Sequence, residues 1–499
     1  MRILLAVLLI LIVSSSTPVL VQPQVFASNP TTCGATIKAS TTLNANLIDC
    51  PRTGLNIDAS NIVLDCAAHS INGTGSDVGI NLTGTSGVTI ENCNTNGFYY
   101  GFQLTSSSHD ILRGDTAENS TGSGFYILNS DPVLSYPCAA NSNGADGFLL
   151  TNSPSTITYC TANNNGGNGF DVLGSSPSTL TGNSASSNAI NGFSFCGATC
   201  GGNSFDSCGP DTLSMNGANN NGGDGFVFSN CSRDRLTGNV ADNDNPAGFA
   251  FGASSRNKLT GNLAGSNSGD GFAFGAYSQG GSNNNNQLTG NLALSNGRDG
   301  FDLSSASNTN TLTGNMASDN LGEGYYISLS SGNTLNKNTA DGNEQDGFDV
   351  YSSSHTTLST NTADGNTLDG FVVGYSPSPP SSSSSGNRLT SNTADGNSND
   401  GFYVISSSGN TFRTNTADGN AVNGFYLTSS PNQPHQPNHL IKNTADENLY
   451  GFGDDSTGGS GPHGSTNDYT SNTCAGNLIG AVVQGNPSTP PNYCIPQTP

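Results

Sequence analysis

Basic residues are scarce in this chain of 499 residues, which has 13 Lys and Arg against 36 Asp and Glu and a formal net charge of −23. Nucleic acids and anionic membranes are bound through basic patches that neutralise phosphate, so this balance argues against both as partners. Cations are more compatible with such a surface. No motif specifies a cofactor, and Ca²⁺ stays open as a ligand although the calcium repeat G-G-x-G-x-D is absent.

Tryptophan is absent, and Met and His are rare, at 3 and 6 residues. The lack of Trp removes the side chain best suited to stacking on a sugar ring and leaves tyrosine for that role. Copper handling requires clusters of Met and His ligands, which so few residues do not provide. His435 and His439 could ligate a metal, but a Pro-rich segment displays histidine with or without one.

Long apolar runs are missing after the N-terminus. The opening residues MRILLAVLLILIVSSS are too short to span a bilayer, which needs roughly 20 residues, and have the pattern of a secretory signal. We predict a signal peptide at residues 1–27, cleaved after Ala27. The mature chain is therefore expected to be secreted or at the cell surface, or periplasmic if the host has an outer membrane, without a transmembrane anchor.

The dipeptide Gly-Phe recurs along the chain, mostly every 22 to 24 residues. A fixed period of that length, with no helix-length apolar stripe between the marks, indicates a solenoid whose units bury their apolar faces only by stacking. The glycines are Gly101, Gly124, Gly147, Gly169, Gly192, Gly225, Gly248, Gly271, Gly300, Gly347, Gly370, Gly401, Gly424 and Gly451, with Gly324 before Tyr325 in the one variant.

Apolar residues within each repeat come in short alternating pairs, such as Phe348 with Val350, followed by Leu358. This is the period of β-strands, and the intervening Asn, Gly, Ser and Asp residues are typical of turns. The pattern predicts an all-β fold, a single-stranded right-handed parallel β-helix of roughly 17 coils with about 22–23 residues per coil. We assign 28–53 to a disulfide-stapled N-terminal cap, 54–480 to the β-helix and 481–499 to a C-terminal cap or tail.

An asparagine stands nine residues before most of the glycines. In stacked coils these side chains fall one above another, about 4.8 Å apart, where their amides can hydrogen-bond to each other and to turn backbone. We therefore predict an asparagine ladder inside the coil, beside a column of stacked phenylalanine rings. The ladder residues are Asn92, Asn183, Asn216, Asn239, Asn262, Asn291, Asn315, Asn338, Asn361, Asn392 and Asn415.

Twelve cysteines, an even number, suit an oxidising compartment. Cys138 and Cys160 occupy the ladder position of consecutive coils, so we favour a disulfide between them over two stacked thiols. Two further pairs are expected to staple the ends of the solenoid, Cys33 with Cys50 and Cys474 with Cys494. A further group, Cys196, Cys200, Cys208 and Cys231, fits two disulfides or, less readily in an oxidising compartment, a metal site.

The longer coils begin at Gly192, Gly271, Gly370 and Gly424, and each carries its insertion after the Gly-Phe strand. The insertions therefore share one corner of the solenoid. Such insertions commonly build a binding face, although loops are also tolerated wherever turns are loose.

A basic quartet is expected beside this corner. Arg233 and Arg256 lie eight residues past successive glycine marks, and Arg235 and Lys258 lie ten past, so the two pairs should stack on neighbouring coils. Guanidinium forks in that arrangement could hold a carboxylate or sulfate of an anionic polysaccharide, which makes these four the candidate substrate-binding residues. The alternative is that they neutralise nearby acids, namely Asp234, Asp242 and Asp244.

Acidic residues form two columns of their own. Turn capping is the simplest role for them, with screening by water or Ca²⁺ as the alternative. Asp302 and Asp349 share an outward column with Tyr326, about 9.6 Å apart, near the range of inverting glycosidases. An exposed pair on a flat sheet should not have a raised pKa, so we assign no catalytic residue. The columns are Asp341, Asp364, Asp395 and Asp418 in TADGN, and Asp224, Asp270, Asp299, Asp346, Asp369 and Asp400 before Gly-Phe.

The phrase I-x-L-D-x-x-x-H-x-I-x-G is formed by Ile62, Leu64, Asp65, His69, Ile71 and Gly73. With the repeats that follow, it resembles the opening coils of secreted right-handed β-helix proteins of the pectate lyase-like superfamily, which includes lyases, mannuronan epimerase-like enzymes and NosD-like periplasmic accessory proteins. The resemblance implies the fold but no activity. Such lyases use a Ca²⁺-binding carboxylate cluster with a catalytic Arg or Lys, and such epimerases an Asp-Pro-His motif, whereas the only Asp-Pro here, at Asp131, precedes Val133.

Two functions are compatible with these features. The first is a secreted or cell-surface scaffold, monomeric and non-catalytic, that binds polysaccharide or surface glycans through the loop corner, and the regularity of the repeats favours it. The alternative is a polysaccharide lyase or hydrolase acting on anionic, uronate-type polymers, which the basic quartet beside acids favours. Turnover of such polymers would separate the two.

Overall fold

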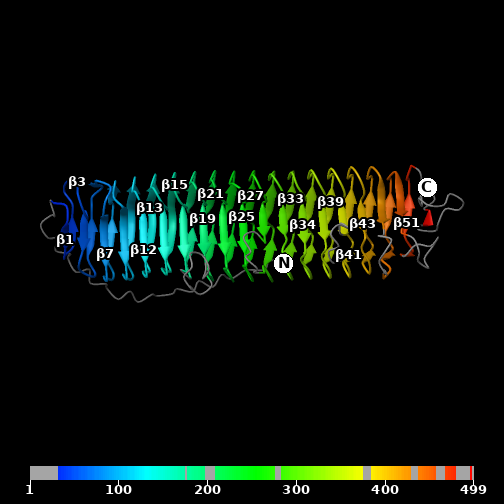
Figure 1. Ribbon diagram of the computed structural model, residues 1–499, viewed down its shortest axis with the longest axis horizontal. Helices are drawn as coiled ribbons and strands as arrows, with labels where there is room; N and C mark the ends of the chain where they lie inside the picture. The colour runs from blue at the N-terminus through cyan, green and yellow to red at the C-terminus, as the bar shows by residue number, and fades with distance from the viewer. Residues whose placement is uncertain are drawn as a thin grey trace, which may run out of the picture.

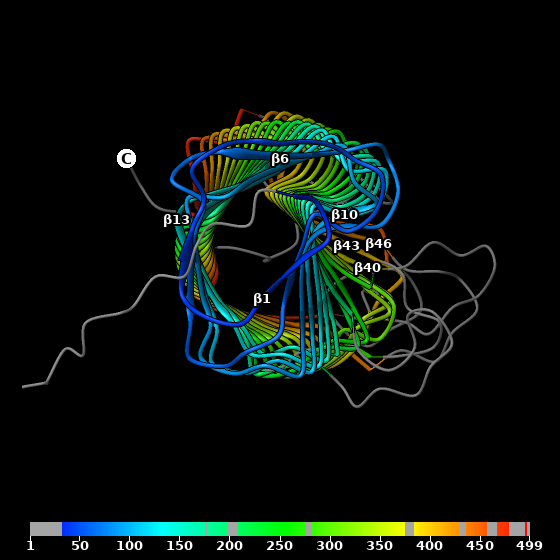
Figure 2. The ribbon, with the colours of Figure 1, turned by 90° about the vertical axis from the view of Figure 1, so that its left-hand side faces the viewer.

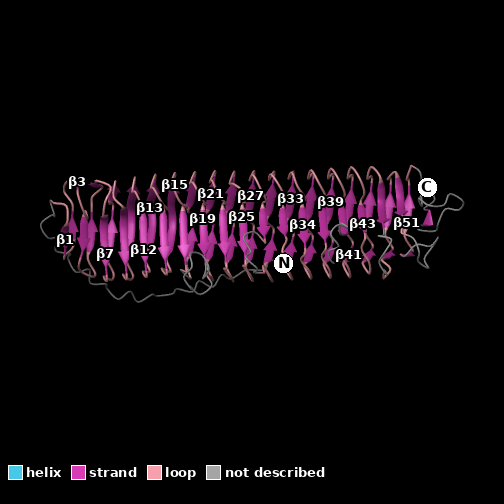
Figure 3. Cartoon of the chain, in the orientation of Figure 1, coloured by secondary structure: helices cyan, strands magenta, loops and turns pink. Residues whose placement is uncertain are grey.

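Parallel β-strands stack along nearly all of the chain that the structure describes. The computed structural model describes residues 32–174, 177–196, 208–275, 282–374, 384–428, 436–456 and 467–478, with the strand β52 (Ile495–Pro496). They form a right-handed parallel β-solenoid of about 17 turns with no helix among them (Figures 1 and 3). The predicted fold class is confirmed. The same residues contain no helix with the length and apolar character needed to cross a membrane.

Sheet A collects the Gly-Phe strands into one parallel sheet of 18 strands. Its pairing is in register, and the inward rings of Phe301, Tyr325 and Phe348 stack face to face with centroids 4.9 and 4.6 Å apart. Viewed down the long axis, the coils superimpose (Figure 2). The strands of sheet A are β1 (Ala35–Ile37), β4 (Leu55–Ile57), β7 (Val78–Thr83), β10 (Tyr100–Thr105), β12 (Phe125–Leu128), β14 (Phe148–Thr151), β16 (Phe170–Leu173), β19 (Phe193–Cys196), β22 (Phe226–Ser229), β25 (Phe249–Gly252), β28 (Phe272–Phe274), β31 (Phe301–Leu303), β34 (Tyr325–Ser328), β37 (Phe348–Tyr351), β40 (Phe371–Gly374), β43 (Phe402–Ile405), β46 (Asn423–Thr428) and β49 (Tyr450–Asp454).

The remaining strands close the coil, usually as two short strands per turn. In one representative turn, β35 (Thr334–Asn336) and β36 (Thr339–Asp341) lie on either side of a bend at which Asn338 points inward. Because side chains alternate along a strand, each three-residue strand buries its middle residue, here Leu335 and Ala340. The interior therefore consists of parallel columns of Phe, Leu, Ala and Asn.

The predicted asparagine ladder is present. The side-chain amide of Asn338 donates to Oδ1 of Asn361 and to the carbonyl oxygen of Leu312, both at 3.0 Å. Its own Oδ1 accepts from the backbone N–H and the side-chain amide of Asn315. Every polar atom of this buried amide is thus paired without water, which is what a polar interior requires.

Two further ladders run at other corners of the coil. Their residues stand four residues and mostly 14 residues before the glycines, a regular spacing that the prediction of a single ladder does not include. In both, a side-chain oxygen accepts the backbone N–H of the equivalent residue one coil earlier, and at many steps it also accepts that residue's side-chain amide. The second ladder includes Asn143, Asn165, Asn188, Asn221, Asp244, Asn267, Asn296, Asn320, Asn343 and Asn366, and the third includes Asp211, Asp234, Asn257, Asn286, Asn310, Asn410, Asn438 and Asn467.

The assignment of Asn92 to the first ladder is wrong. Asn92 lies exposed in a left-handed turn with φ of 56°, and Cys93 takes the inward position instead. The N–H of Cys93 donates to Oδ1 of Asp115 in the next coil, as the asparagines do elsewhere. The segment that leads from this position to Gly101 is one residue shorter than in later coils, which shifts the register counted back from the glycine.

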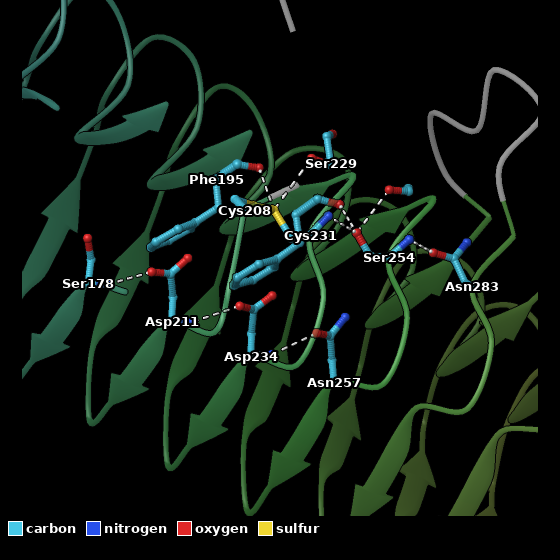
Figure 4. The surroundings of a disulfide bond; sticks show 12 residues. Ser178, Phe195, Cys208, Asp211, Ser229, Cys231, Asp234, Ser254, Asn257 and Asn283 are labelled. Atoms are coloured by element: carbon cyan, nitrogen blue, oxygen red, sulfur yellow. Dashed lines mark hydrogen bonds between the residues drawn. A yellow bond between two sulfur atoms is a disulfide. The ribbon is translucent and has the colours of Figure 1, made fainter. Parts of the chain in front are cut away.

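Disulfide bonds tie neighbouring chain segments together. The predicted bridges Cys33–Cys50 and Cys138–Cys160 are confirmed. The structure also has a bridge at Cys66–Cys93, which is not predicted because the spacing assigns Asn92 to the inward position that Cys93 occupies. A further bridge at Cys208–Cys231 agrees with the disulfide interpretation of that group (Figure 4).

Several predictions fall wholly or partly on residues outside the described ranges. Cys196 and Cys474 are disulfide-bonded, but the cysteines expected near them, Cys200 and Cys494, are not described. The signal peptide, most of each inserted loop and His435 also lie outside the described residues. The domain boundaries stay predictions.

Tyr325 stands in the phenylalanine column with a fully buried hydroxyl that has no hydrogen-bond partner among the described residues. A buried unpaired polar group of this kind costs about 1–3 kcal/mol. We expect Tyr325→Phe to raise the free energy of unfolding by about 1–2 kcal/mol, measured by urea denaturation. The reverse change one coil away, Phe348→Tyr, should lower it, and a destabilised Tyr325→Phe variant would show that the hydroxyl has a partner.

Candidate functional site

The outward side chains of sheet A form one column along the solenoid. In β31, Phe301 and Leu303 point inward, so Asp302 points outward. In-register pairing places Asp302, Tyr326 and Asp349 on consecutive coils, as the sequence predicts. We call this column the floor. From β22 to β49 the floor consists of Val227, Ala250, Ala273, Asp302, Tyr326, Asp349, Val372, Tyr403, Tyr426 and Gly453.

An acid row runs along one edge of the floor, in the turn before each sheet A strand. Oδ1 of Asp299 accepts the backbone N–H of Glu323 at 3.0 Å, and Oδ1 of Asp346 accepts that of Asp369 at 2.8 Å. These carboxyls cap the turn of the following coil, which confirms the turn-capping interpretation at these positions. The acid row consists of Asp224, Asp270, Asp299, Glu323, Asp346, Asp369 and Asp400.

Burial raises the pKa of both floor acids. The pKa of Asp302 rises to about 8, through burial first and then through the negative charges of Asp270 and Asp299. Burial also raises the pKa of Asp349 well above its usual value. Oδ1 of each floor acid is buried with no hydrogen-bond partner among the described residues. The expectation of an exposed pair with ordinary acidity is therefore wrong, because the acid row and the neighbouring floor residues shield these carboxyls from water.

The acid row contains groups of differing acidity. Burial raises the pKa of Asp270 and Asp346 only to about 6, whereas it raises the pKa of Asp369 to about 8. The pKa of Asp299 also rises to about 8, through burial and then through a hydrogen bond with Glu323. At neutral pH, protonated and ionised carboxyls therefore lie side by side, which is the arrangement found where groups exchange protons with a substrate.

A hollow of about 310 Å³ opens over the floor at Ala250 and Ala273, whose small side chains leave space beside Asp302. Arg298 lines this hollow, and its Nη1 lies 3.7 Å from Oδ2 of Asp270. The repeat pattern does not predict a role for Arg298, because the equivalent position carries no basic residue in the other coils. Arg298 is thus the one basic residue in the described lining of this hollow, and it is paired with Asp270.

A second hollow, of about 360 Å³, lies further toward the C-terminal end of the floor, where Tyr403, Tyr426 and Tyr450 converge. Tyr403 and Tyr426 are two of the four outward tyrosines, with Tyr126 and Tyr326, that the repeat pattern predicts on this column. The floor and the acid row run from one hollow to the other along successive coils, and we call this strip of surface, with its two hollows, the groove.

Three carboxylates converge between the hollows. One oxygen each from Glu323, Asp346 and Asp349 lies within 4.8 Å of the others, and the described residues hold no second set of three His, Cys, Asp or Glu ligand atoms. Hard oxygen ligands suit Ca²⁺ or Mg²⁺, whereas copper prefers imidazole and sulfur. Of the two histidines singled out, His439 pairs its Nδ1 with Oδ2 of Asp468 at 3.1 Å.

The basic quartet does not line the groove. Arg235 and Lys258 face each other in register on β23 (Arg235–Thr237) and β26 (Lys258–Thr260), as the spacing predicts. With Arg233 and Arg256 they are exposed, and none of the four forms an ion pair with a described residue or lines either hollow. Asp234 is buried in the third ladder, so it is not the acid that they neutralise. Their part in substrate binding stays a prediction.

Family comparisons account for most of the solenoid. A family model described as right handed beta helix region matches residues 53–208 and 273–382, just over half of the chain. The chain belongs to the right-handed β-helix family. A second model, described as periplasmic copper-binding protein (NosD), matches residues 369–489 of this β-helix protein. The described part of that segment contains no methionine and one histidine, His439, which is paired with Asp468, so these residues do not fit a copper site.

Solved structures similar to this β-helix protein are remote. The periplasmic alginate epimerase AlgG is 11% identical with a TM-score of 0.24, over 88% of this chain and 78% of its own. The A-module of the mannuronan C-5 epimerase AlgE4 from Azotobacter vinelandii is 13% identical with a TM-score of 0.27, over 89% and 91%. A DFA-IIIase from Arthrobacter chlorophenolicus without its lid is 12% identical with a TM-score of 0.25, over 57% and 66%. No curated protein matches the chain.

Proposed function

We propose that this β-helix protein binds a polysaccharide chain along the groove formed by the floor and the acid row. The observation that carries the proposal is that a carboxyl group recurs on each successive coil of the acid row from Asp270 to Asp400, about 4.8 Å apart. It lies beside the floor tyrosines Tyr326, Tyr403 and Tyr426. Such a row suits a ligand that is itself a linear repeat. Tyrosine rings stack on sugar faces, and carboxyl groups bond to sugar hydroxyls. The disulfides support a site of action outside the cytoplasm, at the cell surface, in the medium or in a periplasm.

The charge of the groove favours a neutral or cationic glycan. Seven acids line its edge, and two more lie on the floor, while Arg298 is the one basic residue among the described lining of the two hollows. A uronate polymer would be repelled there. Such a polymer would need either the basic quartet or Ca²⁺ held between the protein and its own carboxylates. The three converging carboxylates are the ligands that this chain offers to Ca²⁺.

Cleavage of the bound glycan is a second candidate function, which the raised pKa of the floor acids favours. Asp302 stays protonated near neutral pH and can donate a proton to a leaving oxygen, while an acid with a lower pKa, such as Asp346, can serve as the base.

Binding to the groove is tested by screening the mature protein against neutral, amino and uronate polysaccharides, each with Ca²⁺ and with chelator. We expect Tyr326→Ala to weaken binding at least about 10-fold, because the change removes the ring at the middle of the floor. Arg235→Ala is the matched control, since it truncates an exposed side chain of the basic quartet and should leave binding unchanged.

The opposite result, with binding lost in Arg235→Ala and kept in Tyr326→Ala, would contradict the groove and place the site on the basic quartet. The same screen separates the two candidate functions by following reducing ends. Reducing ends that form without unsaturated products and disappear in Asp302→Asn would establish hydrolysis, and binding without products would establish a non-catalytic glycan-binding protein.

A further inference from the structure

The hollow at the C-terminal end of the groove combines aromatic and acidic walls. Its lining includes Tyr403, Tyr426 and Tyr450 together with Asp400 and Asp455, and none of its described lining residues is Lys, Arg or His. The rings of Tyr403 and Tyr426, which lie in register on β43 and β46, stack with centroids 5.6 Å apart. The hollow therefore has aromatic faces and negative charge but no basic side chain to compensate that charge.

Gly453 ends the aromatic stack. It lies in register with Tyr426 on β49, and a Cβ atom added to it would approach Cδ2 of Tyr426 to 3.0 Å. Glycine at this floor position therefore adds no side chain over the Tyr426 ring. The ring is left open toward the hollow, where a ligand can pack against its face.

The two acids are held in place by neutral donors. Oδ2 of Asp455 accepts the hydroxyl hydrogen of Tyr426 at 2.7 Å, and Oδ1 of Asp455 is buried with no hydrogen-bond partner among the described residues. Oδ1 of Asp400 accepts the backbone N–H and the side-chain amide of Asn423, at 2.9 and 2.8 Å. These donors are neutral, so they leave the negative charge of both acids uncompensated within the described lining of the hollow.

We infer that this hollow binds a protonated primary amine on a sugar ring, so that the glycan is a polymer of amino sugars. The inference rests on the proposed function and narrows its ligand class. An ammonium group over the Tyr426 ring is attracted by the negative face of the aromatic system and by the carboxylate charges of Asp400 and Asp455, which line the same hollow. The net charge of −23 also draws a polycation toward the protein from a distance.

A neutral sugar fits this hollow less well. It can stack on the tyrosines, but it brings no charge to the two carboxylates. A uronate meets carboxylates of its own sign. The hollow is therefore expected to prefer a sugar whose nitrogen carries a positive charge. Acetylation of that nitrogen removes the charge.

The test compares hexasaccharides of glucosamine and of N-acetylglucosamine, which differ in whether the nitrogen carries charge. Calorimetric titration of the mature protein should show the glucosamine form binding at least about 10-fold more tightly, with an affinity that falls as salt is added. Asp455→Asn, which keeps the size of the side chain, should remove most of this preference, and Tyr426→Ala should weaken the binding of both sugars. Asp395→Asn, at an exposed carboxyl of the TADGN column, is the matched control and should change neither affinity.

Equal affinity for the two hexasaccharides would overturn the amine inference while leaving the groove as a glycan site. A preference for glucosamine that survives Asp455→Asn would also overturn it, since the amine would then bind elsewhere. Failure to bind any polysaccharide of the wider screen would instead overturn the proposed function. Thermal unfolding of each variant, compared with that of the unchanged protein, separates loss of a contact from loss of the fold.

Discussion

The protein is expected to become more stable as the pH falls from about 8 to about 4. Burial raises the pKa of Asp234 and Asp302 to about 8 and that of Asp244 to about 7. Between the ordinary aspartate value and these values, the folded protein holds protons that the unfolded chain has released. Each aspartate therefore makes its full contribution to the free energy of unfolding below the pKa it has in the unfolded chain. As the pH rises from that value toward its pKa in the folded protein, the contribution falls by roughly 1.4 kcal/mol per pH unit. Urea midpoints measured across this range test the direction.

Asp234 allows the effect to be assigned to one residue. In the third ladder its Oδ1 accepts the N–H of Asp211 at 2.9 Å, and its Oδ2 is buried with no partner among the described residues (Figure 4). Asparagine occupies the same column at Asn257 and Asn286, so it fits this position without charge. We expect Asp234→Asn to raise the free energy of unfolding by about 2–5 kcal/mol near pH 8 and to leave it nearly unchanged near pH 4.

Asp341→Asn is the control for this experiment, because Asp341 is exposed on another face of the coil. It should shift stability by no more than about 0.5 kcal/mol at either pH. Stability that rises with pH, or an Asp234→Asn variant that is destabilised near pH 8, would mean that the buried carboxyls are ionised in the folded protein.

Replacing Asn338 by alanine is expected to lower the free energy of unfolding by about 2–4 kcal/mol. The backbone N–H and the side-chain amide of Asn315 both lose the oxygen they share. Asn361 loses one of its donors at the same time, and the missing amide leaves a gap between two coils. A buried polar group deprived of its partner costs about 1–3 kcal/mol, and water cannot reach these groups to replace the bonds. Urea denaturation of the purified variant measures the loss.

Thr334→Ala in the same coil is the control, because Thr334 lies exposed at the start of β35. It should cost less than about 1 kcal/mol. If the two variants lost equal stability, the ladder would contribute nothing beyond ordinary strand packing.

The fold can be predicted from the sequence because its tightest constraints recur once per coil. A Cβ atom at Gly347 would lie 2.7 Å from the carbonyl oxygen of Gly370 and 2.8 Å from Cβ of Ala363, so only glycine fits there. The next residue, Phe348, points into the coil, where a large apolar side chain is needed to fill the interior. Steric constraints of this kind repeat with the chain, and they are visible as a period.

The candidate site can be predicted only in part. In-register stacking places Asp302 and Asp349 in one column, but a period does not show how far the adjacent turn shields them from water. Gly453 and Asp455 stand at the last strand of sheet A, where the repeat loses its regular sequence, and so the tyrosine hollow has no signature in the pattern. Counting back from glycine assumes turns of constant length, which fails at Asn92.

The ladders make the length of this molecule adjustable. Each coil contacts mainly the coils on either side of it, and Asn315, Asn338 and Asn361 make equivalent bonds at intervals of 23 residues. If 23 residues, one whole coil, were removed, the coils on either side would make the same hydrogen bonds to each other, and each column would stay continuous. A gene for this chain can therefore gain or lose whole coils by in-frame duplication or deletion, and each coil gained or lost would lengthen or shorten the proposed glycan-binding groove by the same step.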